Sequence, residues 1–301
     1  MLRFSIIVPI YNVEKDIRQC FESISNQKFK DFEVLCIDDC GTDNSMDIVK
    51  EFTQNDSRFK ILTHDTNKGV ATARNTALKE VSGEYILFID PDDWVENNAL
   101  EALDNAIKES VNPDAVVFGY NNCYPDGTVE DHDYEENSTL KIDVNNINYI
   151  VGCIWNKVFK TSKVRELGVD FPDGLIIEDA EFCFKFFTQI DKCYITKGIY
   201  YNYRKGREGS YTTEDVAGDR IIDTFKILER MYEFSIKKGL FKKYKKALLE
   251  YFCKTIKGIL QCPNQKDKVL ETADKLLDKM DFPTAFKDLA QPKLSLSFWK
   301  N

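Results

Sequence analysis

The first 120 residues alternate between short, continuously apolar runs and longer stretches in which apolar residues recur every three or four positions. The short runs are typical of strands covered on both faces, and the longer stretches are typical of amphipathic helices. We therefore predict strands at residues 4–9, 32–37, 59–62, 85–89 and 115–118. Helices are predicted near residues 14–26, 45–55, 70–81 and 99–109. Repeated strand–helix units indicate an α/β fold with a mostly parallel central sheet flanked by helices.

This alternation stops after residue 120. A turn signal at residues 124–128 is followed by an acidic stretch, and we interpret residues 121–145 as a solvated, mobile loop or hairpin. Residues 146–212 carry mixed helix and strand signals. From about residue 215 the pattern is wholly helical, with two apolar stripes that are typical of core-facing helix surfaces.

Composition narrows the class of protein. The 301 residues are 43% hydrophobic but contain no apolar run of 18 residues, so no transmembrane helix is expected. The chain starts directly with a predicted strand and without a separate signal segment, which predicts a cytoplasmic location. The nine cysteines include no C-x-x-C pair, and with only two histidines they predict neither a zinc site nor a disulfide framework.

The charge is uneven along the chain. A net charge of −9 argues against a general nucleic-acid binder. Residues 235–260, however, hold eight lysines against the single acid Glu250. Such a helix can lie on the anionic surface of a membrane as a peripheral contact, or it can be a solvated outer helix packed on the body of the protein.

Three aspartates follow the predicted strand at residues 85–89. Asp90, Asp92 and Asp93 would repel one another unless a cation lies between them, and Mg²⁺ or Mn²⁺ is the hard divalent ion that carboxylates and phosphates bind. Ligand sites of open α/β sheets collect at such strand ends. The alternative is structural, because Asp92 or Asp93 could cap a helix that runs through residues 98–103.

The other strand ends of the first half also carry polar residues suited to a nucleotide. They are residues 9–12, residues 38–43, and residues 67–69 with residues 73–75. An aspartate can accept a hydrogen bond from the imide of uracil, and Arg74 and Lys68 supply positive charge. Each residue also has an ordinary structural interpretation: Asp39 as a helix cap, Gly69 as a turn and Arg74 as a surface residue.

The segments Ile7–Asn12, Ile37–Asp43, Asn67–Asn75 and Phe88–Asp93 resemble, in order and spacing, those of family 2 glycosyltransferases of the GT-A fold. Further blocks that resemble this family are Trp155–Phe159, Glu178–Phe182 and Tyr201–Ser210. The resemblance implies a GT-A nucleotide-binding fold over residues 1–212, with a nucleotide-binding half (1–120) and an acceptor and catalytic half (121–212), and a C-terminal helical extension over residues 213–301. Cys40 departs from the pattern, because the family usually has glycine there.

The resemblance implies a role for each matching residue. The nucleotide-sugar-binding residues would be Pro9, Tyr11, Asn12, Asp39, Lys68, Arg74, Asp90, Trp155, Asn156, Lys157, Arg204 and Ser210. Of these, Pro9, Tyr11 and Asp39 would border the uracil with Arg74 nearby, and Asp90 would face the ribose or sugar. The Trp155–Lys157 block would shape the donor-sugar and acceptor region, and Arg204 and Ser210 would reach the diphosphate from a closing loop. Asp92, with Asp90, would bind the metal. Asp179 would be the catalytic base with Glu178 as its neighbour, although acids at this place also favour the first turn of a helix.

The expected function is that of a metal-dependent inverting glycosyltransferase, which moves a hexose or N-acetylhexosamine from a UDP-sugar to a hydroxyl of a glycan or lipid-linked acceptor. This chemistry needs a cation for the departing UDP and a carboxylate for the acceptor hydroxyl. One alternative is a catalytically inactive sugar-nucleotide-binding partner of a polysaccharide assembly complex, but Asp92 and Asp179 are both present. A nucleotidyltransferase would need a glycine-rich loop after its first strand, and residues 9–14 contain no glycine.

Overall fold

The structure is a computed structural model that describes residues 2–207, 217–259 and 266–280. The chain forms two compact units. The first comprises Met1–Ile142, Cys153–Gly174 and Gln189–Glu214. The second comprises Asp143–Gly152, Leu175–Thr188 and Asp215–Asn301, so that two short inner segments group with the C-terminal helices.

Half of the sheet in the first unit is the predicted parallel one. Its strands lie in the order β3-β2-β1-β4 and are β1 (Phe4–Ile10), β2 (Phe32–Asp38), β3 (Phe59–Thr63) and β4 (Tyr85–Phe88). The connecting helices are α1 (Ile17–Ser25), α2 (Ser45–Asn55) and α3 (Val70–Glu80), and α4 (Ala99–Glu109) follows β4. These elements match the predicted ranges within three residues at each boundary, which confirms the interpretation of residues 4–109. The fifth predicted strand, at residues 115–118, is present but extends to Cys123, into the segment predicted as a loop or hairpin.

The other half of the sheet is mixed. β9 (Lys157–Lys160) lies antiparallel between β4 and β6 (Ala115–Cys123), and β10 (Lys192–Arg204) runs parallel to β6. The edge strand β5 (Trp94–Val95) pairs with β10, while β7 (Val129–His132) pairs with β6 and β8 (Ser138–Lys141) with β10. The acidic stretch after residue 124 therefore includes exposed strands, one of which returns along β6 as a hairpin. The helix α6 (Thr161–Leu167) follows β9.

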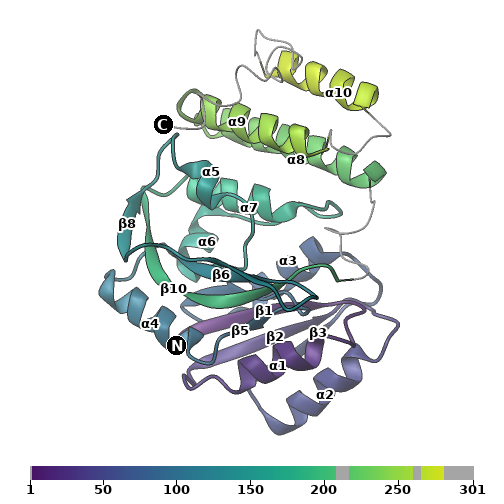
Figure 1. Ribbon diagram of the computed structural model, residues 1–301, viewed down its shortest axis with the longest axis vertical. Helices are drawn as coiled ribbons and strands as arrows, with labels where there is room; N and C mark the ends of the chain where they lie inside the picture. Colours follow the sequence, from purple (N-terminus) through teal and green to yellow (C-terminus); the bar gives the residue numbers. More distant parts are fainter. Residues whose placement is uncertain (1, 208–216, 260–265, 281–301) are drawn as a thin grey trace. The chain divides into compact units, whose positions relative to one another are not determined.

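Side chains on both faces of β1 are buried, as its unbroken apolar run predicts. All seven of its residues are buried. Phe4, Ile6, Val8 and Ile10 belong to one core with residues of α1 and α4, whereas α3 packs against β1 and β2. Because successive strand residues point to opposite faces, helices must cover both sides of the sheet. Figure 1 shows α1 and α3 on opposite faces of these strands.

The second unit is helical in its described part. Its helices are α5 (Ile147–Ile150), α7 (Glu178–Phe187), α8 (Ala217–Lys237), α9 (Phe241–Ile259) and α10 (Lys266–Lys279). Leu228 of α8, Phe252 of α9 and Leu277 of α10 share one core, so the apolar stripes are core faces as predicted. Among the described helices, none is both long enough and apolar enough to cross a bilayer.

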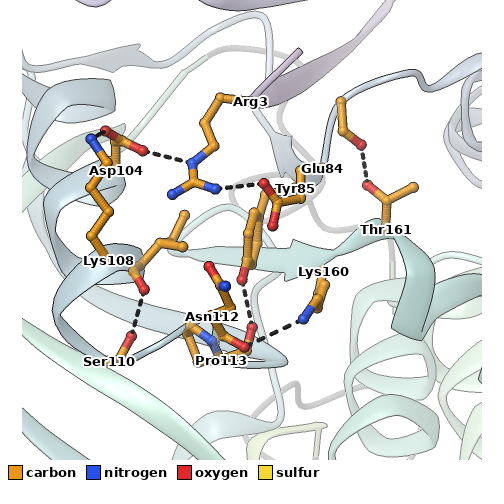
Figure 2. A network of polar contacts seen from close by, with 12 residues as sticks. Arg3, Glu84, Tyr85, Asp104, Lys108, Ser110, Asn112, Pro113, Lys160 and Thr161 are labelled. Carbon is orange, nitrogen blue, oxygen red and sulfur yellow. Dashed lines mark hydrogen bonds and ion pairs between the residues drawn. The ribbon is translucent and has the colours of Figure 1, made fainter. Parts of the chain in front are cut away.

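Polar contacts tie the strands together at the amino-terminal edge of the parallel half of the sheet (Figure 2). Arg3 donates to Asp104 of α4 at 2.6 Å and to Glu84 at 2.5 Å. Tyr85 donates its hydroxyl to the Pro113 carbonyl at 2.9 Å. Thr161, the first residue of α6, donates to the Gly83 carbonyl at 2.6 Å, which joins the start of α6 to the segment before β4. These internal contacts therefore fix this edge of the sheet.

Glu33 is a buried carboxylate near the same edge. Its oxygens accept hydrogen bonds from Ser5 Oγ at 2.6 Å, from the Ser82 amide at 2.8 Å and from Lys60 Nζ at 2.8 Å. Burial opposes ionisation, but these donors outweigh it and lower the pKa of Glu33 to about 2. Gly83 completes the arrangement, because a Cβ there would lie 2.4 Å from the Ser5 nitrogen.

Substituting Glu33→Gln should lower the free energy of unfolding at neutral pH by about 1–3 kcal/mol, since buried donors lose a charged acceptor. A depressed folded-state pKa stabilises the protein above the unfolded-state value near 4.5, and this stabilisation is lost as the pH falls toward 2. The difference between wild type and variant in urea titrations should therefore shrink between those pH values. A difference that stays constant over this range would contradict the role given to Glu33.

Candidate active site

The three aspartates form a turn directly after β4, which we call the aspartate turn (Asp90–Asp93). Helix α4 begins later, at Ala99, with Asn98 as its N-cap residue. The alternative in which Asp92 or Asp93 caps that helix is therefore wrong. The turn lies at the carboxyl end of a parallel strand, the edge at which α/β sheets bind ligands.

Each carboxylate of the aspartate turn has a different partner. Asp90 Oδ1 accepts from Arg74 Nη2 at 2.7 Å, and Asp92 Oδ2 lies 2.8 Å from Arg207 Nε. Asp93 is 1% exposed and accepts from the Tyr201 hydroxyl and the Arg204 amide, both at 2.7 Å. Burial and the neighbouring charge of Asp90 raise the pKa of Asp92, and burial with both neighbouring charges raises that of Asp93. Burial and mutual repulsion thus disfavour the ionised forms of Asp92 and Asp93.

The donor set of the aspartate turn fits a hard divalent cation. The Asp90 and Asp92 side chains are 24% and 16% exposed, so their oxygens are accessible, whereas those of Asp93 are directed into the protein. Within the part of the chain that the structure describes, no group of three or more ligating side chains is present. One or two carboxylates with substrate phosphates and water is the way in which proteins commonly bind Mg²⁺.

Asp39 follows β2 and is bound from three sides. It accepts from the Lys68 amide at 2.9 Å, the Gly69 amide at 2.8 Å and His64 Nδ1 at 2.7 Å. The second ring nitrogen of His64 lies 2.9 Å from Thr76 Oγ1, so a neutral ring with its proton on Nδ1 satisfies both contacts. Asp39 does not cap α2, whose N-cap residue is Asn44. It instead fixes the loop that leads into α3, and sequence reasoning missed its partner His64.

The loop after β1 carries an exposed aromatic ring and an unusual backbone. Tyr11 is 47% exposed, and Asn12 has a φ of 52° and accepts from the Thr42 amide at 2.7 Å. Cys40, in the neighbouring loop, has a φ of 58°. The residue that departs from the family's glycine therefore lies in the left-handed region, which costs a non-glycine residue about 1–2 kcal/mol. Pro9 lies within β1 and pairs with Ile37.

The Trp155–Lys157 block lies in the interior of the first unit. The Trp155 ring stacks on Tyr201 at 4.7 Å and on Tyr203 at 5.1 Å between centroids. Lys157, 2% exposed, donates to the Cys153 carbonyl at 2.7 Å and to Asn156 Oδ1 at 2.6 Å. All three side chains are thus buried, and that of Trp155 packs against the end of β10.

A pocket of about 420 Å³ is lined in part by Arg204 and Arg207, which both contact Asp92 of the aspartate turn. The charged residues of its lining are of both signs: Lys15, Arg204, Lys205 and Arg207 with Glu14, Asp16 and Asp43. Arg204 donates through Nε to the Asp92 carbonyl at 2.8 Å, and its guanidinium lies over the Trp94 ring at 4.9 Å. Burial lowers the pKa of the neighbouring Lys205, whose ammonium lies over the Tyr203 ring. Ser210, the other residue of this predicted group, lies outside the described residues, and the Lys68 side chain is exposed on its loop.

Glu178 and Asp179 begin α7 in the second unit. The interpretation as a helix start is thus confirmed, and it leaves a catalytic role open. Two residues further on, Glu181 is fully buried and accepts from Arg230 at 2.7 Å and from Lys185 at 2.7 Å. Arg230 lies on α8, so its contact with Glu181 joins α7 to α8.

The fold is that of GT-A glycosyltransferases. The S. aureus TarS fragment 1–349 in complex with UDP-GlcNAc superposes with a TM-score of 0.68 at 24% identity, over 92% of this chain and 72% of that one. The mannosyltransferase PcManGT from Pyrobaculum calidifontis, in complex with GDP-Man and Mn²⁺, superposes with a TM-score of 0.58 at 18% identity, over 99% of this chain and 81% of that one.

The sequence places the chain within a family. Residues 5–169 match the model of glycosyl transferase family 2, and the chain belongs to that family. It is 31% identical over 233 residues to "Glycosyltransferase GlyA" of Streptococcus pneumoniae, covering 70% of this chain and 32% of that protein. It is 29% identical over 215 residues to the poly(ribitol-phosphate) beta-N-acetylglucosaminyltransferase TarS of Staphylococcus aureus, covering 70% and 37%. The chain thus spans about a third of the length of these relatives.

Proposed function

We propose that this chain is a metal-dependent inverting glycosyltransferase that moves a hexose or N-acetylhexosamine from a UDP-sugar to a hydroxyl of a glycan or lipid-linked acceptor. The observation that carries the proposal is the aspartate turn at the carboxyl edge of the sheet, with Arg74 and Arg207 against two of its carboxylates. TarS, a relative with the same fold, has been solved with UDP-GlcNAc, which supports a UDP-sugar as donor. Residues 1–212 would form the catalytic domain.

The donor nucleotide would lie across the ends of β1, β2 and β4. Tyr11 offers an exposed ring for stacking. Asp39, which is buried and bound by three protein donors, would border the uracil by fixing the loop that leads into α3. Asp90 would accept from ribose hydroxyls while Arg74 balances its charge. Arg204 and Arg207, which line the pocket beside the aspartate turn, would contact the diphosphate, because guanidinium groups suit phosphate oxygens.

The chemistry requires stabilisation of UDP as it departs. Asp92 and Asp90 would hold Mn²⁺ or Mg²⁺, which when bound supplies positive charge to the diphosphate. Asp179 would accept the proton of the acceptor hydroxyl as that hydroxyl attacks the anomeric carbon from the face opposite to UDP. Glu181 is a poorer candidate for the base, since Arg230 and Lys185 already bind it.

The runner-up proposal is an inactive sugar-nucleotide-binding partner of a polysaccharide assembly complex. It would share the donor site and differ in turnover alone. A panel of UDP-sugars, assayed for hydrolysis and transfer with Mn²⁺ and with chelator, separates the two. Binding of a UDP-sugar without any turnover would favour the inactive partner.

Metal dependence is tested with Asp92→Asn, and with Asp47→Asn on the exposed face of α2 as the matched control. Loss of a bound cation removes several kcal/mol of stabilisation from the departing diphosphate, so turnover should fall on the order of 10²-fold or more. The control should keep wild-type turnover, and circular dichroism should show both variants folded. Full activity of the wild type in excess EDTA would refute the metal.

The base is tested with Asp179→Asn, compared with Glu229→Gln, an exposed acid of α8. Turnover of the Asp179 variant should fall on the order of 10²–10⁴-fold because a positioned proton acceptor is lost. Affinity for UDP, measured by calorimetry, should stay near that of wild type. Wild-type turnover in this variant would remove Asp179 from the mechanism and direct attention to Glu178.

A peripheral membrane contact is a further part of the proposal. The apolar face of α9 is buried in the helical core, through Tyr244, Leu248 and Phe252. Lysines of the outer face of α9 remain exposed and include Lys242, Lys243 and Lys246. Contact with anionic lipid would therefore be electrostatic, at roughly 1 kcal/mol for each lysine near the surface.

The double variant Lys242→Glu/Lys243→Glu should reduce co-sedimentation with anionic liposomes at low salt, whereas Lys50→Glu on α2 should not. High salt should release the wild type, because the attraction decays within a Debye length. Negligible wild-type binding to both anionic and neutral liposomes would leave this helix as scaffold.

A further inference from the structure

The end of β10 holds the aspartate turn through four hydrogen bonds. Two come from the hydroxyl of Tyr201, which accepts from the Asp90 amide at 3.1 Å and donates to Asp93 Oδ2 at 2.7 Å. Two come from Arg204, whose amide donates to Asp93 Oδ1 at 2.7 Å and whose Nε donates to the Asp92 carbonyl at 2.8 Å. Three of the four residues of the turn are thus fixed by one strand that lies more than 100 residues later in the chain.

The aspartates of the turn therefore divide into two kinds. Both carboxylate oxygens of Asp93 accept from β10, and the side chain is 1% exposed. Asp90 and Asp92 keep side chains that are partly exposed at the edge of the sheet. Asp93 is consequently unsuited to bind a ligand, although in the sequence it is an aspartate like the other two.

Tyr201 is itself held rigidly. Its side chain is fully buried, and its ring stacks on Trp155 with 12° between the ring planes. Trp155 stacks in turn on Tyr203, so the aromatic rings fix the direction in which the hydroxyl of Tyr201 points. A hydroxyl with one donor and one acceptor contact at fixed positions can define the backbone of the turn that it joins.

We infer that Tyr201 and Asp93 are positioning residues, which hold Asp90 and Asp92 in the arrangement that binds the divalent cation. The inference rests on the proposed function, because it assumes that these two carboxylates bind metal. Groups that orient metal ligands without touching the metal commonly change its affinity 10–100-fold when they are removed. Tyr201 is then more than a core residue, since its loss would alter ligand binding in a protein that remains folded.

The chain offers a matched control. Tyr85 lies on β4, the strand that leads into the turn, and is fully buried like Tyr201. Its hydroxyl makes one hydrogen bond, to the Pro113 carbonyl at the other end of the strand (Figure 2). Tyr85→Phe and Tyr201→Phe therefore each remove one buried hydroxyl from the same unit, but Tyr201 alone contacts the aspartate turn.

The experiment is a titration of full-length protein with Mn²⁺ at saturating UDP, followed by the electron paramagnetic resonance of free Mn²⁺. We expect Tyr201→Phe to bind Mn²⁺ 10–100-fold more weakly than wild type and Tyr85→Phe to bind it like wild type. Asp93→Asn should weaken Mn²⁺ binding in the same range. Thermal unfolding of each variant confirms that the titrated protein is folded, and Asp93→Asn carries the test if Tyr201→Phe does not fold.

Wild-type Mn²⁺ affinity in folded Tyr201→Phe and Asp93→Asn would overturn the inference and leave the metal site itself intact. Equal weakening in Tyr85→Phe would also overturn it, because the effect would then follow from any lost buried hydroxyl. A wild-type protein that binds no Mn²⁺ with UDP would refute the metal site of the proposed function, and the positioning role with it. The failure of the inference and that of the proposed function are thus told apart by the wild-type titration.

Discussion

Repulsion among the carboxylates of the aspartate turn is the constraint on which the site depends. Asp90, Asp92 and Asp93 lie within four residues at the end of a buried strand, and the pKa values of the last two are raised by burial and by their neighbours. Each carboxylate has its own partner. Asp90 is paired with Arg74, Asp92 with Arg207, and Asp93 accepts hydrogen bonds from two donors of β10. These partners come from α3 and from the end of β10 and the residues after it, so the turn depends on elements far apart in the sequence.

Local patterns predicted the parallel half of the sheet well. β1 to β4 are short apolar runs in a strand–helix alternation, and sequential parallel units follow from that pattern alone. The antiparallel insertion of β9 between β4 and β6 was not predicted. Its four residues are too few for a distinctive periodicity, and its neighbours are set by pairing with β4 and β6 rather than by its own side chains.

In the site, too, features set by local sequence were predicted, and features set by contacts between distant segments were not. The sequence placed polar residues at the correct strand ends, because the carboxyl ends of parallel strands meet at one edge. It could not distinguish Asp93 from Asp92, since their difference is created by Tyr201 and Arg204. It also missed His64, whose pairing with Asp39 requires two neighbouring loops to meet. The role of the Trp155–Lys157 block beside the donor sugar and acceptor stays a prediction, whereas its burial and its stacking on β10 depend on contacts that the sequence does not show.

The arrangement is a compromise between stability and binding. Burying carboxylates beside one another costs free energy in the folded state. The arginines offset part of that cost, because their attraction to the carboxylates is reduced by the cost of removing the arginines themselves from water. Arg207 contacts the Asp92 carboxylate that a cation would also contact, so the two positive charges compete for one acceptor. A diphosphate would resolve this competition, because it offers Arg207 phosphate oxygens while the cation takes the carboxylate. Under the proposed function the site would therefore bind cation and diphosphate together, and each should bind more weakly alone.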